Sequence, residues 1–190
     1  EELRLFSFSD NKDKLVLSGY GKGLHDLYWI TNDSLALFFD GRTMQSFKNT
    51  IVRITFPEKK TEVLLQSTPP DNGQYFCKSY IDLSPTREHF MFWECDSVSE
   101  TGVGDHSLYL FDVKTKELTK LDCDPTRHTW FLDGKNLLCN RQEKYYMYNI
   151  DEKKYTRIKG LGKAWFDEFH FLNEQYIALV LRGGEMLKDR

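Results

Sequence analysis

Short runs of alternating apolar and polar residues recur along the chain and are separated by clusters of charged and turn-forming residues. Alternation with a period of two is typical of β-strands, whereas helical spacing is scarce here. In one type of unit, a strand rich in aliphatic or aromatic residues is followed by a charged turn and a second strand, which predicts a β-hairpin. Four copies of this outer-type hairpin occur, at 3–17, 51–65, 108–121 and 145–158.

A second type of unit lies between these hairpins and has a shorter turn. Asp133-Gly134 is its clearest turn signal, because glycine adopts a positive φ without a steric penalty. The second strand of this unit is apolar throughout, which predicts a strand covered on both faces by neighbouring sheets. Four copies of this inner-type hairpin occur, at 29–38, 83–93, 131–139 and 171–180.

The two hairpin types alternate strictly, so one hairpin of each type makes a four-stranded unit. The equivalent positions of the outer-type hairpins are separated by 48, 57 and 37 residues and are Phe8, Phe56, Val113 and Ile150. A propeller blade has four strands, and successive blades begin about 40–50 residues apart. We therefore predict an all-β fold, a β-propeller of four-stranded antiparallel blades with about four blade equivalents. A β-sandwich is the alternative, but it does not require this alternation.

Leu83–Arg87 with Phe90–Trp93, and Phe131–Lys135 with Leu108–Asp112, resemble the TolB-type, WD40-like propeller repeat. That repeat combines a Ser-Pro-Asp-Gly-Lys-like turn, an apolar strand, and a Leu-Tyr-x-Asp strand with a charged hairpin. Thr86-Arg87 departs from the Asp-Gly of the turn. Because the family is functionally mixed, the resemblance implies a fold rather than an activity.

We expect residues 1–190 to form a single β-propeller domain or a propeller fragment. The sequence starts with an outer-type hairpin and stops after an inner-type hairpin. Pairing of the last hairpin (165–183) beside the first (3–18) would close a small four-bladed ring and remove exposed sheet edges. The alternative, which we favour because larger propellers are commoner, is that the chain is part of a larger propeller.

Bulk composition limits the classes of partner. The chain has 190 residues, of which 40% are hydrophobic, 29% charged and 15% aromatic, with a net charge of −3 and a pI near 6.0. A net negative charge is not typical of a nucleic-acid-binding protein, which usually carries a basic surface. No apolar run approaches the about 18 residues that a membrane-spanning helix needs. We therefore expect neither nucleic acid nor membrane as a partner.

The cysteines indicate the compartment. Cys77, Cys95, Cys123 and Cys139 are too sparse for a disulfide scaffold and show no Cys-x-x-Cys spacing. Free buried thiols in a reducing compartment are the expected state, and the sequence does not establish their redox state. A cytoplasmic location follows, and a secreted or periplasmic location is the alternative if the N-terminus is processed.

The sequence contains no motif for catalysis or for a cofactor. Gly-x-Ser-x-Gly, His-Glu-x-x-His and paired Cys-x-x-Cys patterns are absent. Gly19–Gly23 lacks the spacing and the strand-to-helix context of a phosphate loop, and Cys123–His128 comes without further metal ligands. Both segments are interpreted as connections between blades. We therefore predict no cofactor and no metal, and favour a role without catalysis.

A rigid frame that presents variable loops on one face is typical of binding proteins. Strand order puts six loops on one face, which we call the loop face: 19–27, 39–48, 66–78, 95–106, 122–129 and 140–144. Its candidate partner-binding residues are Lys22, His25, Arg42, Asp105, His106, Arg127, His128 and Arg141. This cationic and imidazole content favours an acidic peptide or protein surface as the partner. The predicted function is a non-catalytic β-propeller scaffold.

Two other functions stay open at this point. Propellers that resemble this one also form the gating domain of prolyl-oligopeptidase-like serine peptidases, whose hydrolase fold lies elsewhere in the chain. A sugar-binding or sugar-acting propeller is the other alternative. Glycoside hydrolysis needs two carboxylates that converge on one site, and no such pair stands out in this sequence. The identity of the partner and the oligomeric state do not follow from the sequence.

Overall fold

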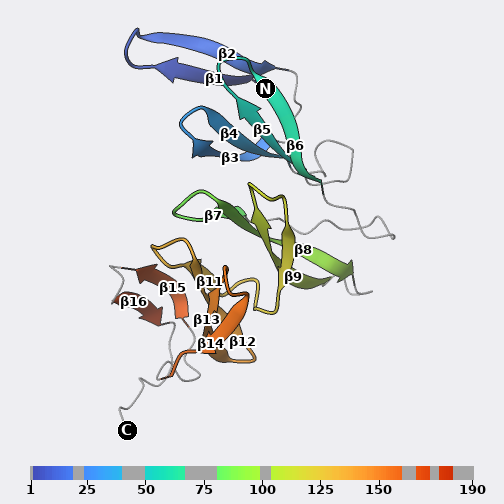
Figure 1. The fold of residues 1–190 in the computed structure, drawn as a ribbon, viewed down its shortest axis with the longest axis vertical. Coiled ribbons are helices and arrows are strands. Elements are labelled where there is room, and N and C mark those ends of the chain that lie inside the picture. The colour runs from blue at the N-terminus through green and yellow to red at the C-terminus, as the bar shows by residue number, and fades with distance from the viewer. Residues whose placement is uncertain are drawn as a thin grey trace. The chain divides into compact units, whose positions relative to one another are not determined.

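The computed structural model describes residues 2–18, 24–39, 50–66, 81–98, 104–159, 166–171 and 176–181. These residues form β-strands joined by turns, and none of them lies in a helix (Figure 1). Accordingly, the described segments include no helix with the length and hydropathy to cross a membrane. The prediction of an all-β chain is confirmed.

Sixteen strands occur among the described residues, and they pair in antiparallel order with their sequence neighbours. The first eight are β1 (Glu2–Ser7), β2 (Lys12–Ser18), β3 (Leu24–Thr31), β4 (Ser34–Phe39), β5 (Thr50–Thr55), β6 (Lys60–Gln66), β7 (Ile81–Leu83) and β8 (His89–Val98). The next eight are β9 (Gly104–Asp112), β10 (Leu118–Leu121), β11 (His128–Trp130), β12 (Asn136–Arg141), β13 (Lys144–Asn149), β14 (Lys154–Arg157), β15 (Phe166–Phe171) and β16 (Ile177–Leu181).

These strands form three four-stranded sheets, β3–β6, β7–β10 and β11–β14, and two hairpins, β1–β2 and β15–β16. Sixteen strands are the number that four blade equivalents need, and three of these blades are complete four-stranded sheets. Within each four-stranded sheet, an inner-type hairpin comes first and an outer-type hairpin second. The sequence pattern therefore predicted both the hairpins and their order.

Contacts along the backbone divide the chain into two compact units. Unit 1 comprises Glu1–Ser79 with Cys95–Gly104, and unit 2 comprises Tyr80–Glu94 with Asp105–Arg190. Unit 1 contains β1–β6, and unit 2 contains β7 and β10–β16 with most of the β8–β9 hairpin. Organisation as one propeller domain over residues 1–190, closed or part of a larger propeller, stays a prediction.

The second strand of each four-stranded sheet is buried on both of its faces. Leu35–Phe38 in β4, Phe90–Phe92 in β8 and Leu137–Asn140 in β12 are all buried. Successive side chains of a strand point to opposite faces, so a continuous buried run requires cover on both sides. This observation confirms the interpretation of the continuous apolar runs.

One backbone hydrogen bond recurs in all three four-stranded sheets. The amide of the residue after the third strand donates to the carbonyl of the residue before the second strand, and we call this contact the turn-joining bond. Its donors and acceptors are Phe56 and Asp33 (2.7 Å), Val113 and Glu88 (2.9 Å), and Ile150 and Lys135 (3.0 Å). The three donors are positions that the sequence repeat predicted to be equivalent.

Each unit has its own apolar core. In unit 1, the β1–β2 hairpin packs on the β3–β6 sheet around Val16, Leu35, Leu37, Val52 and Ile54. In unit 2, the β7–β10 sheet packs on the β11–β14 sheet. The residues of that core are Met91, Leu108, Leu110, Leu121, Trp130, Leu137, Cys139, Tyr148 and Ile150. Packing of one sheet on the next is the arrangement expected of neighbouring blades.

The inner-type turns of the two sheets in unit 2 share a backbone shape. Gly134 has a φ of +64°, and Arg87 at the matching place has a φ of +63°. The amide of Gly134 donates to the Phe131 carbonyl (3.0 Å), and the amide of Arg87 donates to the Ser84 carbonyl (2.8 Å). A Cβ on Gly134 would lie 2.6 Å from Cγ2 of Thr86. Close packing against the neighbouring turn therefore adds to the need for glycine at position 134.

Candidate functional site

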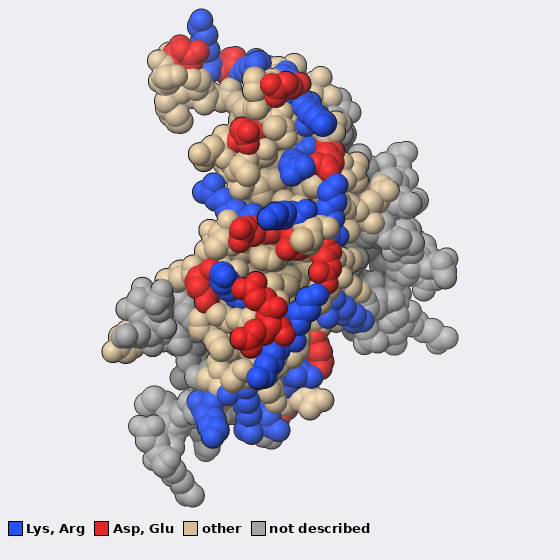
Figure 2. Space-filling model, in the orientation of Figure 1, with Lys and Arg blue, Asp and Glu red and all other residues tan. Residues whose placement is uncertain are grey.

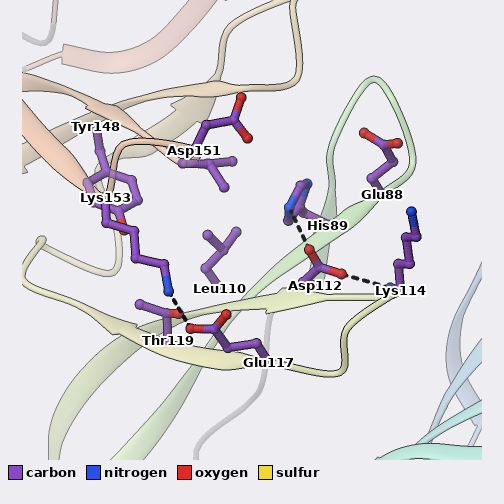
Figure 3. Close-up of a pocket in the computed structure, with 11 residues that line it drawn as sticks. Glu88, His89, Leu110, Asp112, Lys114, Glu117, Thr119, Tyr148, Asp151 and Lys153 are labelled. Atoms are coloured by element: carbon purple, nitrogen blue, oxygen red, sulfur yellow. Dashed lines mark hydrogen bonds and ion pairs between the residues drawn. The ribbon is translucent and has the colours of Figure 1, made fainter.

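A hollow of about 300 Å³ lies in unit 2, where the β7–β8, β9–β10 and β13–β14 turns come together (Figure 3). We call it the turn-side hollow. Its lining residues are Glu88, His89, Leu110, Asp112, Lys114, Glu117, Thr119, Tyr148, Ile150, Asp151 and Lys153. Successive antiparallel strands reverse direction, so these turns lie at the opposite ends of the strands from the loop face.

Asp112 shapes the β9–β10 turn that borders the hollow. Its Oδ1 accepts hydrogen bonds from the amides of Lys114 (2.8 Å) and Thr115 (2.7 Å). Aspartate suits this place because its short side chain can bond to amides two and three residues ahead. The resulting turn places Lys114 and Glu117 beside the hollow.

The other carboxylate oxygen of Asp112 faces His89. His89 Nε2 lies 3.4 Å from Asp112 Oδ2. Burial by itself raises the pKa of Asp112, but hydrogen bonds from Thr115 and Lys114 and the proximity of His89 outweigh it and hold the pKa below its usual value. The carboxylate is therefore ionised at neutral pH and orients the imidazole ring.

The second ring nitrogen of His89 is buried, and no described residue forms a hydrogen bond with it. The ring centroid of Trp130 lies 6.3 Å from that of His89, and the indole Nε1 likewise has no partner among the described residues. Buried polar atoms in folded proteins nearly always have a hydrogen-bond partner. His89 Nδ1 and Trp130 Nε1 are exceptions to this rule among the described residues.

Lys153 and Glu117 form the opposite wall of the hollow. Lys153 Nζ donates to Glu117 Oε1 at 2.5 Å, and this contact joins the outer-type hairpins of neighbouring sheets. The hydrogen bond to Glu117 raises the pKa of Lys153. Figure 3 shows Leu110 between this ion pair and the His89–Asp112 pair. An apolar floor thus lies between two polar walls.

Carboxylates outnumber basic side chains in the lining. The acidic residues are Glu88, Asp112, Glu117 and Asp151, and the lysines are Lys114 and Lys153. Over the described part of unit 2, Figure 2 shows acidic and basic side chains next to one another. Within that mixed surface, the hollow has a local excess of negative charge, which favours a cationic group.

The His89–Asp112 pair is the arrangement in the hollow with a known chemical use. His89 held by Asp112 resembles the base and its orienting carboxylate in a hydrolytic triad. However, the described lining contains neither serine nor cysteine to serve as a nucleophile. Among the described residues, no group of three or more His, Cys, Asp and Glu side chains could hold a metal ion.

The residues predicted for the loop face are described to different extents. Lys22 and Arg42 lie outside the described residues. His25 lies in β3 and Asp105 in β9, and for both only the backbone is described. His106, also in β9, packs edge-on against Trp93 with the ring centroids 4.7 Å apart. His106 thus has a packing partner within its own sheet.

The other three predicted residues lie around the β10–β11 turn. Arg127 Nε is 3.6 Å from a carboxylate oxygen of Asp124, and Arg141 forms an ion pair with Asp122. His128 is partly buried, and burial lowers its pKa to about 4, so its ring is neutral at pH 7. An aspartate accompanies each arginine here. The role of these residues in partner binding stays a prediction.

Asp82 is a titratable residue that the sequence analysis does not single out. It lies in β7, the first strand of its sheet, and pairs with Met91 in β8. Burial raises the pKa of Asp82 to about 6. The hollow was also missed, because Asp112 and Glu117 read as ordinary turn residues in the sequence. Only the packing of two sheets brings them beside Lys153.

The sequence matches no known family profile and no curated protein. Several solved structures are similar to the chain. TolB from Acinetobacter baumannii has a TM-score of 0.54 at 16% identity, covering 97% of this chain and 44% of that one. Acylaminoacyl peptidase from Pyrococcus horikoshii has a TM-score of 0.53 at 8% identity, covering 94% and 33%. An uncharacterized protein from Listeria monocytogenes has a TM-score of 0.51 at 10% identity, covering 80% and 44%.

These similarities agree with the repeated four-stranded antiparallel sheets. The fold is that of a β-propeller. The chain spans less than half the length of each of these three proteins. Identities this low establish a common fold and not a common activity.

Proposed function

We propose that the chain is a non-catalytic propeller scaffold that binds a protein or peptide partner, and that the turn-side hollow receives a lysine or arginine side chain of that partner. The observation that carries the proposal is the lining itself. Four carboxylates and two lysines surround a floor of buried apolar side chains. Lysine and arginine combine an apolar stem with a cationic head, which matches a floor and a rim of this kind.

Glu88 is the carboxylate with the most freedom to meet such a head. Asp112 is engaged with His89, Glu117 with Lys153, and Asp151 with Lys135 at 3.2 Å. No described side chain forms an ion pair or a hydrogen bond with the Glu88 carboxylate. A cation that enters the hollow therefore finds one unpaired carboxylate and the exposed Asp151 nearby.

The volume of the hollow is enough for one long side chain. Drug-sized ligands occupy pockets of about 300–1,000 Å³, and this hollow of about 300 Å³ is at the lower end of that range. Most of the contact area with a partner then lies outside the hollow. A modest affinity for short peptides, on the order of micromolar, is consistent with one anchoring side chain.

The acidic partner predicted for the loop face is a separate proposal. It concerns the opposite ends of the strands, where Arg127 and Arg141 already pair with aspartates. A partner can contact both faces, but the described geometry favours the turn-side hollow because it combines a concave shape with the unpaired carboxylate of Glu88. We also propose, from the resemblance of the turns, that the repeats belong to the TolB-type group.

Selection of random peptides displayed on phage, followed by fluorescence anisotropy with the enriched peptides, tests the proposal. We expect enrichment of peptides that contain arginine or lysine and a loss of affinity of about tenfold when Glu88→Gln and Asp151→Asn are combined. The matched control is Glu143→Gln, in the β12–β13 turn at the other end of the strands, which should leave affinity unchanged.

Two results would contradict the proposal. Enrichment of acidic peptides whose binding depends on Arg141 would move the partner site to the loop face. Labelling of the endogenous protein by a fluorophosphonate probe would instead support the serine peptidase alternative, since a scaffold without a nucleophilic serine is not labelled.

A further inference from the structure

Cys123 and Cys139 lie together at the end of unit 2 opposite the turn-side hollow. Cys139 is fully buried in β12, and Cys123 is partly buried between β10 and β11. The amide of Asp124 donates to the carbonyl of Asn140 at 2.7 Å, so the residues that follow the two cysteines are joined through their backbones. Cys139 belongs to the apolar cluster of unit 2, and Cys123 packs against the same cluster. Both thiols are free.

Tyr155 and Arg141 surround the more accessible sulfur. The Cys123 thiol donates to the Tyr155 hydroxyl, with 3.7 Å between sulfur and oxygen. The same hydroxyl oxygen accepts the amide of Asp122 at 3.0 Å, so the hydroxyl is held in place. When Cys123 loses its proton, the Tyr155 hydroxyl can donate back to the sulfur. The guanidinium of Arg141 lies 4.4 Å from the centre of the Tyr155 ring.

These neighbours favour the thiolate at Cys123 and the thiol at Cys139. A hydrogen bond from Cys139 lowers the pKa of Cys123 against the effect of burial, and Tyr155 and Arg141 lower it further, whereas Asp122 raises it. The pKa of Cys139 is raised, first by the hydrogen bond to Cys123 and then by burial. Redox-sensitive cysteines typically combine a stabilised, partly accessible thiolate with a second thiol beside it.

We propose that Cys123 and Cys139 form a peroxide-sensitive dithiol that closes reversibly into a disulfide. The Cys123 thiolate attacks one oxygen of a hydroperoxide, the O–O bond breaks, and the second oxygen leaves as an alcohol or water after taking a proton. Cys123 is then a sulfenic acid. The Cys139 sulfur attacks the Cys123 sulfur, the S–O bond breaks, and the released hydroxide takes the Cys139 proton and leaves as water.

In total, two thiols and one hydroperoxide give one disulfide, one alcohol and one water. Cys123 is the residue that reacts with the peroxide, because it is the more accessible and the more acidic of the two. Cys139 resolves the sulfenic acid from the buried side. Arg141 and Tyr155 are positioning residues that stabilise negative charge on the sulfur. This inference is independent of the turn-side hollow.

The experiment starts from the reduced chain, treated with hydrogen peroxide, alkylated and digested with trypsin. Cys123 and Cys139 then fall into the separate short peptides 121–127 and 136–141, so a linked pair of these peptides identifies the disulfide directly. We expect this linked pair to be the main oxidised product. Cys77 and Cys95, in the peptides 61–78 and 88–114, serve as internal controls and should stay reduced at the same peroxide dose.

Two variants separate the roles of the cysteines. Cys139→Ser should leave a sulfenic acid at Cys123 that dimedone traps, whereas Cys123→Ser should leave Cys139 reduced. Arg141→Gln should slow the oxidation of Cys123 by about tenfold, because the thiolate is the reacting form and loses a nearby positive charge. Arg157→Gln, on the exposed strand β14, is the matched control and should not change the rate.

The proposal is overturned if Cys123 in the folded chain reacts with peroxide no faster than in the chain unfolded in urea. It is also overturned if the linked peptides join Cys77 or Cys95 in preference to Cys123 and Cys139. Circular dichroism of each variant before oxidation shows whether it is folded, and the wild-type comparison with the unfolded chain stands even if a variant is not.

Discussion

The two four-stranded sheets of unit 2 have the same backbone frame and different polar side chains. Val113 and Ile150 make the same turn-joining bond, yet the residues that pair beside it are His89 with Asp112 in one sheet and Asn136 with Asn149 in the other. In the second pair, Asn149 Nδ2 donates to Asn136 Oδ1 at 3.0 Å. Since a histidine–aspartate pair and an asparagine pair occupy the same place in the two sheets, the backbone frame accepts different side chains there. The first sheet therefore carries an imidazole at a position where the second carries an amide.

The largest expected effect tests whether the two sheets share one core. Leu108 in β9 and Leu137 in β12 are both fully buried and belong to the same apolar cluster. Leu108→Ala and Leu137→Ala should each lower the free energy of unfolding by about 2–5 kcal/mol, because each leaves a cavity in close-packed surroundings. Urea unfolding followed by tryptophan fluorescence measures both. Loss of stability in only one variant would mean that the sheets do not form a common core.

The next effect compares two titratable residues on the first strands of these sheets. His128 in β11 has a pKa of about 4, lowered by burial from 6.5. The unfolded chain therefore binds more protons than the folded chain between pH 4 and 6.5, and stability falls as the pH falls through this window. The loss by pH 4 should be about 3 kcal/mol for this residue. His128→Gln should weaken the dependence of unfolding free energy on pH, and an unchanged dependence would contradict the burial of the ring.

For Asp82 in β7, the unfolding free energy should change with pH in the opposite direction. Burial raises its pKa from 3.8 to about 6, so the folded chain binds more protons than the unfolded chain between these values. Stability therefore falls as the pH rises from about 4 to about 6. Asp82→Asn should raise the free energy of unfolding by about 2 kcal/mol at pH 7 and have little effect at pH 3. An equal gain at both pH values would show that ionisation is not the cause.

A smaller effect distinguishes the two inner-type turns. Gly134→Ala should lower the unfolding free energy by about 1–2 kcal/mol, because the φ is positive and the new Cβ would meet Thr86. Arg87→Gly should instead raise it by about 0.5–1 kcal/mol, because Arg87 already holds a positive φ. Chemical denaturation measures both. If Gly134→Ala were neutral, the close approach of the two turns would be wrong.

The smallest expected effect on stability comes from a substitution that makes the two sheets alike at one position. The same substitution should have the clearest effect on peptide binding. His89→Asn gives the β7–β10 sheet the residue that the β11–β14 sheet has at Asn136. We expect the unfolding free energy to change by less than about 1 kcal/mol, because the position tolerates either residue. Peptide binding in the hollow should weaken, since the imidazole is lost. Glu143→Gln, in the turn at the other end of the strands, is the control and should leave peptide binding unchanged.

Most of the frame could be predicted from the sequence because it depends on local patterns. The hairpins follow from alternation and turn residues, and the equivalence of Phe56, Val113 and Ile150 follows from their spacing. The Asp133-Gly134 turn follows from the conformational freedom of glycine. Each of these signals lies within a few residues or within one repeat, so no knowledge of packing is needed to find it.

The site could not be predicted in the same way. Glu117 and Lys153 form an ion pair that joins two sheets. Arg141 forms an ion pair with Asp122, which comes well before it in the sequence. The Cys123–Cys139 pair has a spacing that matches no motif, so the cysteines read as separate free thiols. In each case the contact depends on how one sheet packs on the next, which the pattern of a single strand does not contain.

The turn-joining bond makes the local opening of each four-stranded sheet measurable. Because the donors Phe56, Val113 and Ile150 occupy matching places in the hydrogen-bond pattern, their amides differ in the sheet around them rather than in the bond itself. Exchange of these amides with deuterium therefore measures the local opening free energy of each sheet. Three signals from the unmodified protein would rank the sheets from the first to open to the last.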